Sequence, residues 1–343
     1  MRTMFLKTKP RSKIKMPNKQ KISVVLATYN GESFVVEQLR SIVNQTVKPD
    51  EIIVVDDCSK DKTLDVVSSF AKQCEISIVI EKNEHNSGVS KTFENGVKRA
   101  SGDIVLFSDQ DDCWRENKVE KILFAMSNYD TDFVFSNAAI VDEKLTDTNV
   151  TLWDSIDFAP KNNNEYVCYE KSEFFPELLK HNVVTGMTVA CRKDFLTKCL
   201  PFPSFLLHDY WLALNASTSV NMIAINDPLV LYRQHSNNVV GVNKKHRKRD
   251  KAALKKRHLI IVQSQIMLFK SVIEICEKNN SSEEIKKMAQ DYYNFSVNRE
   301  NALNTSIFSV LKLRKDYKKY TYRDYRFFEK DIFYRFFLKG EYK

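Results

Sequence analysis

Residues 21–57 read KISVVLATYNGESFVVEQLRSIVNQTVKPDEIIVVDD, and this stretch decides the fold class. It begins with the β-branched run Ile22–Ala27, continues with apolar residues at helical spacing, and ends with a second β-branched run, Glu51–Val55. Short continuous apolar runs of this kind are typical of strands that are buried on both faces of a parallel sheet. A helix between two such strands indicates an α/β fold.

The same alternation continues along the chain. Ile76–Ile80 and Ile104–Phe107 are further apolar runs of strand length, and Leu64–Ala71 has the apolar spacing of an amphipathic helix. We therefore predict a doubly wound α/β half, with helices on both faces of the sheet. In such folds the ligand binds outside the carboxyl ends of the strands, so the residues that follow each strand are the first candidates for a site.

After Phe107 the pattern becomes less regular, and we expect a mixed second half. Its expected elements are a helix at Trp114–Met126, strands near Phe133 and Val189, a helix that starts at His208, and strands at Met222–Ile225 and Leu229–Tyr232. Beyond Asn243 the chain becomes rich in lysine and then in aromatic residues, which predicts a helical extension. The expected organisation is a basic tail at 1–20, an α/β domain at 21–243 with halves at 21–112 and 113–243, and an extension at 244–343.

Charge is distributed unevenly along the chain. The 343 residues have a net charge of +9, and 43% of them are hydrophobic, which excludes an intrinsically disordered protein. Residues 1–21 carry about +8 and residues 244–343 about +13, which leaves about −12 for the middle. An acidic body argues against nucleic acid as the partner and fits a catalytic domain held near an anionic surface by basic flanks. For the basic run at 244–257 two interpretations stay open, a solvated helix face and contact with anionic lipid.

The cysteines and the apolar runs bear on the class and the location of the protein. Seven cysteines are scattered between Cys58 and Cys276 without a CxxC pair, so we expect reduced, mostly buried thiols rather than disulfides or a zinc site. The first twenty residues lack the apolar core of a secretory signal. The apolar run nearest to the length of a membrane span, His258–Ile275, is interrupted by polar residues at 263–265 and by Lys270. We therefore expect a cytosolic protein.

Two motifs follow the first two predicted strands. Thr28–Gly31 lies between a strand and a helix, where the N–H groups of a helix N-terminus can bind part of a nucleotide. Asp56 and Asp57 end the next strand, and carboxylates at that place can accept hydrogen bonds from a base or a ribose. Either aspartate could instead cap the following helix.

Three carboxylates, those of Asp109, Asp111 and Asp112, follow the fourth predicted strand. Like charges this close together are costly without a cation, and their oxygen atoms suit Mg²⁺ or Mn²⁺ bridging a diphosphate. An acidic turn before a helix would explain one of them but hardly three. Two further motifs, His208–Trp211 and Tyr232–His235, would more often be capping or core residues when taken alone.

Taken in order, these motifs resemble the family 2 glycosyltransferases of the GT-A fold, and among them the bacterial rhamnosyltransferase-like branch. The resemblance covers about residues 21–242, and its joint pattern is specific although each segment alone is not. The segments that carry it are VVLATYNGESFVVEQLRSIVNQ, EIIVVDDCSKDKT, NSGVSKTFENGVKRASGDIVLFSDQDDCW, HDYWLAL and LYRQHSNNVVG. It implies a Rossmann-like mixed sheet with helices on both faces, in which residues 21–112 bind the sugar donor and residues 113–243 face the acceptor.

The resemblance also implies roles for the matching positions. The residues implied to bind the nucleotide of the sugar donor are Thr28, Tyr29, Asp57, Asn86, Gly88 and Asp109. Those implied to hold Mn²⁺ or Mg²⁺ are Asp109, Asp111 and His235. Asp209 is the implied general base, which must lie within about 3 Å of the acceptor hydroxyl to take its proton. The candidates for contact with the acceptor sugar are Trp114, His208 and Trp211, and core packing is an equal alternative for the two tryptophans.

The function that the resemblance implies is metal-dependent, inverting transfer of one sugar to a glycan of a bacterial surface polysaccharide, such as O-antigen or capsule. The branch favours dTDP-L-rhamnose as the sugar donor, with a UDP-hexose or a UDP-N-acetylhexosamine as alternatives. A lipid-linked acceptor would place the enzyme in the cytoplasm at the inner membrane, as a peripheral protein on an anionic lipid surface. The sequence has no QxxRW segment after the base, unlike the processive synthases of the family, so we expect one sugar per encounter.

Two other classes compete with this interpretation. A sugar-nucleotide nucleotidyltransferase shares a nucleotide-binding α/β half, but it normally opens with a glycine-rich loop and a basic residue for the triphosphate, which Thr28–Gly31 does not supply. A non-enzymatic protein that binds a membrane or nucleic acid would use the run at 244–257 and the aromatic tail. One departure from the family is Cys58, which stands where glycine is usual after the paired aspartates.

Overall fold

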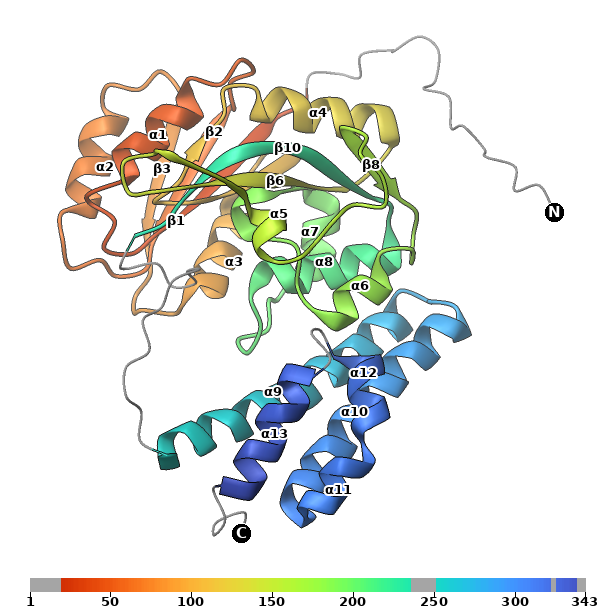
Figure 1. Ribbon diagram of the computed structural model, residues 1–343. Helices are drawn as coiled ribbons and strands as arrows, with labels where there is room; N and C mark the ends of the chain where they lie inside the picture. The colour runs from red at the N-terminus through yellow and green to blue at the C-terminus, as the bar shows by residue number, and fades with distance from the viewer. Residues whose placement is uncertain (1–19, 236–250, 322–324, 338–343) are drawn as a thin grey trace. The chain divides into compact units, whose positions relative to one another are not determined.

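The computed structural model describes residues 20–235, 251–321 and 325–337 (Figure 1). These residues form two compact units that interleave in sequence. The first comprises residues 20–169, 184–209 and 220–235, and the second comprises residues 170–183, 210–219, 251–321 and 325–337. Residues 1–19 of the predicted tail at 1–20 and the basic residues at 244–250 lie outside the described residues.

Ten strands form one mixed sheet in the first unit. They are β1 (Ile22–Thr28), β2 (Glu51–Asp56), β3 (Ser77–Lys82), β4 (Ile104–Asp109), β5 (Cys113–Trp114), β6 (Phe133–Val141), β7 (Asp147–Thr151), β8 (Tyr166–Tyr169), β9 (Val189–Arg192) and β10 (Met222–Arg233). The order is β3-β2-β1-β4-β9-β6-β10-β5, with β7 beside β6 and β8 beside β10. The first four strands are parallel, and β9 runs antiparallel to both β4 and β6, so the predicted mixed sheet is confirmed.

Helices cover both faces of this sheet. They are α1 (Val35–Val43), α2 (Thr63–Ala71), α3 (Val89–Arg99), α4 (Lys118–Tyr129), α5 (Leu152–Ser155), α7 (Lys193–Cys199) and the 3-10 helix η1 (Gly186–Thr188). Phe107 of β4 points towards α3, where its ring centre lies 5.4 Å from that of Phe93. The next residue, Ser108, points to the opposite face and shares a hydrogen bond of 2.6 Å with Gln38 of α1.

Two predicted elements differ from the structure. The helix expected from Trp114 begins only at Lys118, because Trp114 belongs to β5 and pairs with Val230. The two strands expected at 222–225 and 229–232 are one strand, β10, whose register shifts on both sides of Pro228. Proline has no N–H to give to the ladder, so a single strand can pass through this position only as an irregularity.

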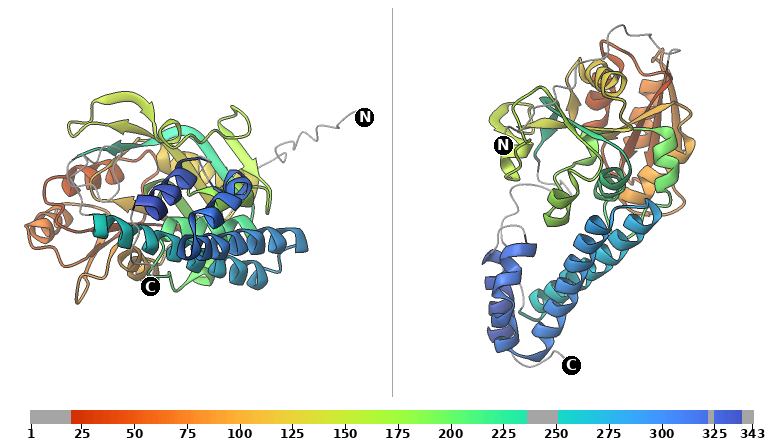
Figure 2. Two further views of the ribbon diagram at one scale, coloured as in Figure 1. Left: turned by 60° about the horizontal axis from the view of Figure 1, so that its bottom comes forward. Right: turned by 90° about the vertical axis from the view of Figure 1, so that its right-hand side faces the viewer.

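The second unit is helical, as predicted for the extension, but it also takes in two segments from within the α/β region. Its helices are α6 (Phe175–Lys180), most of α8 (His208–Ser219), α9 (Lys251–Lys278), α10 (Glu283–Thr305), α11 (Ile307–Lys312), α12 (Arg314–Tyr320) and α13 (Tyr325–Phe337). The long helices α9 and α10 run side by side (Figure 2). Tyr210 of α8 donates a hydrogen bond to the backbone oxygen of Leu178 in α6 (2.5 Å).

A buried charge cluster joins four helices of the second unit. Arg299 of α10 donates from Nε (2.6 Å) and Nη2 (2.9 Å) to the two carboxylate oxygens of Asp331 in α13. The same carboxylate accepts from Tyr317 of α12 and lies 2.6 Å from Nε2 of His258 in α9. Because all four side chains are buried, a carboxylate with this many partners fixes how the helices pack.

The expectations about cysteines and apolar runs have different outcomes. All seven cysteines are free, and four of them are buried, as predicted. In contrast, Arg257–Lys278 passes as a membrane span by length and composition, with a mean hydropathy of 1.6, although we had discounted this stretch. It is the only such helix in the described part of the chain. Within the bundle it buries Val262, Val272 and Cys276 completely, but only 28% of the apolar window is buried, which is less than the core helix of a folded domain buries.

Candidate functional site

The carboxyl ends of β1, β2 and β4 meet at one edge of the sheet. Thr28 of β1 lies beside Asp56 of β2, and Ala27 lies beside Asp109 of β4. Because these strands are parallel and in register, the loops that follow them lie next to one another. The structure therefore brings together the predicted nucleotide-binding and metal-binding loops within the first unit.

Gln110 links the first of these loops to the acidic loop. Its amide oxygen accepts from the N–H of Tyr29 (2.9 Å), and its amide nitrogen donates to the backbone oxygen of the same residue (3.0 Å). A Cβ at Gly31 would lie only 2.0 Å from the amide oxygen of Gln110, so any larger residue there would displace this amide. Thr28 is buried and donates to Asp56 (3.1 Å), whereas Tyr29 keeps 43% of its surface exposed. Sequence reasoning missed Gln110, which lies between Asp109 and Asp111, the two predicted metal ligands.

The Asp57 carboxylate holds the loop that follows β3. It accepts from the N–H groups of Ser87 (2.7 Å) and Gly88 (2.9 Å) and from the amide of Asn83 (2.8 Å). Gly88 has a φ of 83°, which is a left-handed conformation that favours glycine. Asn86 donates to the backbone oxygen of Asp57 (3.2 Å). Three of the predicted nucleotide-binding residues therefore lie together, and Asp57 also organises the loop that carries the other two.

The acidic loop concentrates negative charge at the end of β4. Burial raises the pKa of Asp109 to about 7, and the neighbouring carboxylates of Asp111 and Asp209 contribute to the rise. Burial also raises the pKa of Asp112 well above its usual range, with Asp111 and Asp109 adding to it. One oxygen of Asp112 accepts from the N–H of Arg233 (3.1 Å), and the other is buried without a hydrogen-bond partner. This loop would bind a cation favourably, because a cation would offset the repulsion.

The residues around Asp111 fit a divalent cation that is shared with a substrate. Nε2 of His235 lies 2.9 Å from Oδ2 of Asp111, so this predicted pair is brought together by the structure. Among the described residues no group of three His, Cys, Asp or Glu side chains is assembled to hold a metal. Mg²⁺ commonly takes only one or two protein carboxylates and completes its shell with substrate phosphates and water. Asp111, His235 and the nearby Asp109 are therefore a suitable set for a cation that arrives with a diphosphate.

Arg233 holds the acidic loop from the end of β10, and sequence reasoning did not single it out. Its Nε donates to the backbone oxygen of Asp111 (2.7 Å), and its Nη1 donates to that of Glu143 (2.5 Å). Its Nη2 forms an ion pair with Glu37 of α1 (2.5 Å). A single buried guanidinium therefore fixes the backbone of Asp111 against α1 and against the turn at Glu143.

Asp209 is buried at the start of α8, and its Oδ2 accepts from the N–H of Gly186 (2.9 Å). Gly186 belongs to η1, whose next residue, Met187, accepts from the ammonium of Lys118 (2.6 Å). Lys118 is fully buried, 3.7 Å from the centre of the Trp114 ring, and burial lowers its pKa well below the usual range. Its charge acts on Asp112 and Asp109. The implied base and the acidic loop are therefore joined through Lys118 and η1.

Two of the three predicted acceptor residues, Trp114 and His208, are buried in the first unit. Trp114 is buried beneath Lys118. His208 is buried against Phe93, with ring centres 4.1 Å apart, and burial lowers its pKa to about 3, so the imidazole is neutral. Trp211 is half-buried and belongs to the second unit. Trp114 and His208 therefore pack inside the first unit, and their contact with the acceptor stays a prediction.

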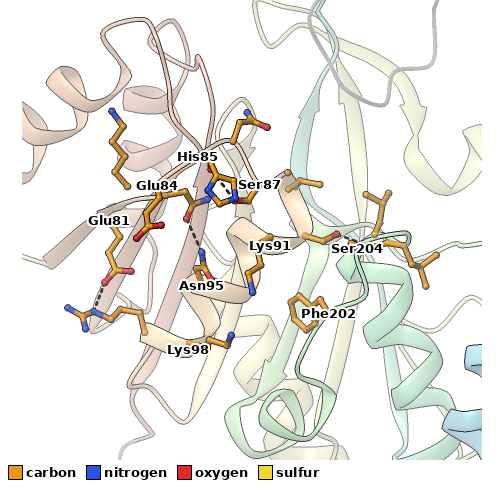
Figure 3. Close-up of a pocket in the computed structure, with 18 of the residues that line it drawn as sticks. Glu81, Glu84, His85, Ser87, Lys91, Asn95, Lys98, Phe202 and Ser204 are labelled. Carbon is orange, nitrogen blue, oxygen red and sulfur yellow. Dashed lines mark hydrogen bonds and ion pairs between the residues drawn. The ribbon is translucent and has the colours of Figure 1, made fainter.

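A groove of about 1130 Å³ adjoins the loop held by Asp57 (Figure 3). One wall is α3 with the loop before it, and the other is the segment 202–207 that leads to Asp209. Figure 3 shows Lys91, Asn95 and Lys98 along α3, with Phe202 and Ser204 opposite them. The Oγ of Ser90 donates to the backbone oxygen of Leu206 (3.1 Å), which ties the two walls together.

The family model described as Glycosyl transferase family 2 matches residues 23–199, which is more than half of the chain. The chain belongs to this family. The dTDP-rhamnosyl transferase RfbG of Shigella flexneri is 29% identical over 232 residues, which cover 64% of this chain and 74% of that protein.

Solved structures support the GT-A fold of this glycosyltransferase. TarS residues 1–349 of S. aureus, in complex with UDP-GlcNAc, align with a TM-score of 0.55 and 18% identity over 90% of this chain and 83% of that chain. The alignment with a longer TarS chain spans only 43% of that chain. The mannosyltransferase PcManGT of Pyrobaculum calidifontis, in complex with GDP-Man and Mn²⁺, aligns with a TM-score of 0.51 and 16% identity over 94% and 88% of the two chains.

Proposed function

We propose that this glycosyltransferase moves one sugar from a nucleotide sugar to a glycan, with inversion at the anomeric carbon, in the synthesis of a bacterial surface polysaccharide. The observation that supports this most directly is that η1 holds Asp209 through the N–H of Gly186 and is itself held by Lys118, at the start of the helix that follows the acidic loop. The charge of Asp209 also contributes to the raised pKa of Asp109. A base and a diphosphate-binding loop that act on each other serve one site. Such a site can hold an acceptor hydroxyl beside a sugar diphosphate.

In this proposal Asp209 takes the proton from the acceptor hydroxyl while that oxygen bonds to the anomeric carbon and the bond from that carbon to the diphosphate breaks. The N–H of Gly186 orients the carboxylate by holding one of its oxygens. His208 stays neutral because burial lowers its pKa to about 3, so it neither competes for that proton nor pairs with the carboxylate. No covalent enzyme intermediate is required.

On the side of the sugar donor, the exposed ring of Tyr29 would stack on the base of the nucleotide. Asn86 and Gly88 would line the same pocket, and Asp57 would hold their loop and accept a hydrogen bond from the base or ribose. Asp109, Asp111 and His235 would hold Mn²⁺ or Mg²⁺, which as a Lewis acid stabilises the charge that develops on the departing diphosphate. The likeness to PcManGT, which was solved with Mn²⁺, supports this assignment.

The sugar donor we propose is dTDP-L-rhamnose, on the basis of the resemblance to RfbG. UDP-N-acetylhexosamine or a UDP-hexose is the alternative, which the likeness to TarS in complex with UDP-GlcNAc favours. For the acceptor we propose a lipid-linked glycan that lies in the groove between α3 and segment 202–207, since that segment leads to Asp209. A lipid-linked acceptor would hold the enzyme at the cytoplasmic face of the inner membrane.

Calorimetry with a panel of dTDP, UDP and GDP sugars tests the proposal, with Mn²⁺, with Mg²⁺ and with chelator. We expect one sugar donor to bind only with metal, and Asp111→Ala to raise its Kd by more than about tenfold. Asp65→Ala, on the exposed face of α2, is the matched control and should leave the Kd unchanged. If no nucleotide sugar binds under any metal condition, the proposed function is wrong.

A further inference from the structure

Two neighbouring helices of the second unit expose large apolar side chains. Phe308 and Leu311 lie on one face of α11, and Phe333 and Phe336 lie on one face of α13, each pair three residues apart. The exposed fraction is 72% for Phe308 and 51% for Phe336. We call these four residues the aromatic patch. Single exposed apolar residues are ordinary, but a group of them marks a surface that binds something.

The two helices that carry the patch pack against each other. Helices α11 and α13 are in contact, and Nη2 of Arg335 donates to the backbone oxygen of Thr305 (2.6 Å). Arg335 directly precedes Phe336, and Thr305 lies three residues before Phe308. The bond therefore joins the last turn of α13 to the C-terminal end of α10, just before α11 begins.

Positive charge is concentrated on the helices that carry the patch and on α12 between them. The exposed basic residues on the same helices and the short α12 between them are Lys312, Arg314, Lys315, Lys318, Lys319 and Lys330. Residues 305–337 carry a net charge of about +5, and Asp331, one of the few acids among them, is buried against Arg299. These helices thus carry both exposed aromatic rings and an excess of positive charge.

We propose that the aromatic patch docks this protein on an anionic phospholipid bilayer. Phenylalanine and leucine side chains would enter the boundary between headgroups and acyl chains, and the lysines on these helices would contact the lipid phosphates. The patch lies wholly in the second unit, so docking through it does not depend on the proposed glycosyl transfer.

A second copy of the chain suits the same surface less well. A symmetric contact through the patch would bring two cationic surfaces together, and like charges repel. Four side chains also fall short of the 20 to 30 residues a side, burying about 800 Å² per partner, that a stable interface usually has. An anionic bilayer offers both the apolar depth and the opposite charge.

The test is co-sedimentation of the full chain with vesicles of phosphatidylcholine alone and of phosphatidylcholine with phosphatidylglycerol. We expect binding to the phosphatidylglycerol vesicles that weakens as salt increases. Phe308→Asp with Phe336→Asp should lower the partition coefficient by more than about tenfold, since each ring loses its burial in lipid. Lys312→Glu with Lys315→Glu should lower it by about fivefold for each lysine removed.

The matched control is Phe124→Asp, which alters a phenylalanine with 47% of its surface exposed on α4 of the first unit. It should leave vesicle binding unchanged. Circular dichroism melts would show whether each variant is folded. We expect all of them to fold, because the substituted positions are exposed. Equal binding by wild type and the Phe308→Asp, Phe336→Asp variant would overturn the proposal. The proposal would also be overturned if the wild type did not bind the vesicles and the Phe308→Asp, Phe336→Asp variant changed its oligomeric state in light scattering. A second copy of the chain would then cover the patch.

Discussion

The ammonium of Lys118 donates to the backbone oxygen of Met187 over a distance of 2.6 Å, with both residues buried. Through this bond the helix that follows the acidic loop holds η1, and the N–H of Gly186 in η1 holds the carboxylate of Asp209. The proposed base and the proposed metal site therefore share one internal support. The distance between Asp209 and the acidic loop therefore depends on Lys118, which in our proposal contacts neither the sugar donor nor the acceptor.

Lys118→Met should lower kcat much more than it changes binding of the sugar donor. The change keeps most of the volume but leaves the oxygen of Met187 without its buried donor, at a cost of about 1 to 3 kcal/mol in stability. Movement of η1 would then misplace Asp209, and we expect kcat to fall by about tenfold or more. Steady-state kinetics and calorimetry would separate the two effects. Lys121→Met, one turn further on the same helix, breaks a surface pair with Glu165 and should preserve kcat.

Asp209→Asn should abolish most of the transfer while the sugar donor still binds. The amide oxygen can still accept from the N–H of Gly186, so the local fold should be kept. An amide cannot take the proton of the acceptor, and loss of a general base costs about 10²- to 10⁴-fold in rate. Asp194→Asn, on the exposed side of α7, is the control. A kcat within about threefold of wild type would remove Asp209 from the mechanism.

Gly31→Ala and Gln110→Ala should have similar effects that do not add. The new methyl group would displace the amide of Gln110, so either change removes the two hydrogen bonds to Tyr29. We expect each to cost about 1 to 2 kcal/mol in stability and to weaken binding of the sugar donor. A double-mutant cycle measured by urea unfolding tests this, since independent effects would sum and shared ones would not.

The strands and loops that form the proposed site could be predicted because local patterns specify them. Apolar runs of strand length put Asp57 and Asp109 at strand ends, and parallel neighbours bring such ends to one edge. The position of the helix after Trp114 could not be predicted in this way, because the pairing of Trp114 with Val230 joins residues far apart in sequence. Tertiary pairing outweighed the helical spacing there.

The supporting residues could not be predicted for the same reason. Arg233 and Asp111 are 122 residues apart, and Lys118 and Met187 are 69 apart. Lys118 lies in none of the motifs, and although Arg233 lies in the motif Tyr232–His235, the motif does not show which residues it would bind. Nor could the pattern show that segments 170–183 and 210–219 pack with the C-terminal helices, since each looks like a continuation of the α/β region.

The buried cluster around Asp331 should make the helical unit sensitive to acid. Burial opposes ionisation of this carboxyl, but hydrogen bonds from Arg299 and His258 outweigh it and lower the pKa from 3.8 to about 2. A lowered pKa in the folded state stabilises the fold above about pH 4, by about 2 kcal/mol, and this stabilisation is lost as the pH falls towards 2. Asp331→Asn removes this stabilisation and leaves Arg299 buried without a counter-charge, which should cost about 3 to 5 kcal/mol near neutral pH.

Urea unfolding, followed by helical circular dichroism at pH 7 and pH 3, measures this cost. We expect the difference in unfolding free energy between wild type and Asp331→Asn to shrink in acid. The control Asp291→Asn breaks a surface pair with Lys287 and should differ little from wild type at either pH. If Asp331→Asn lowered the free energy of unfolding equally at both pH values, the lowered pKa of Asp331 would not be the cause.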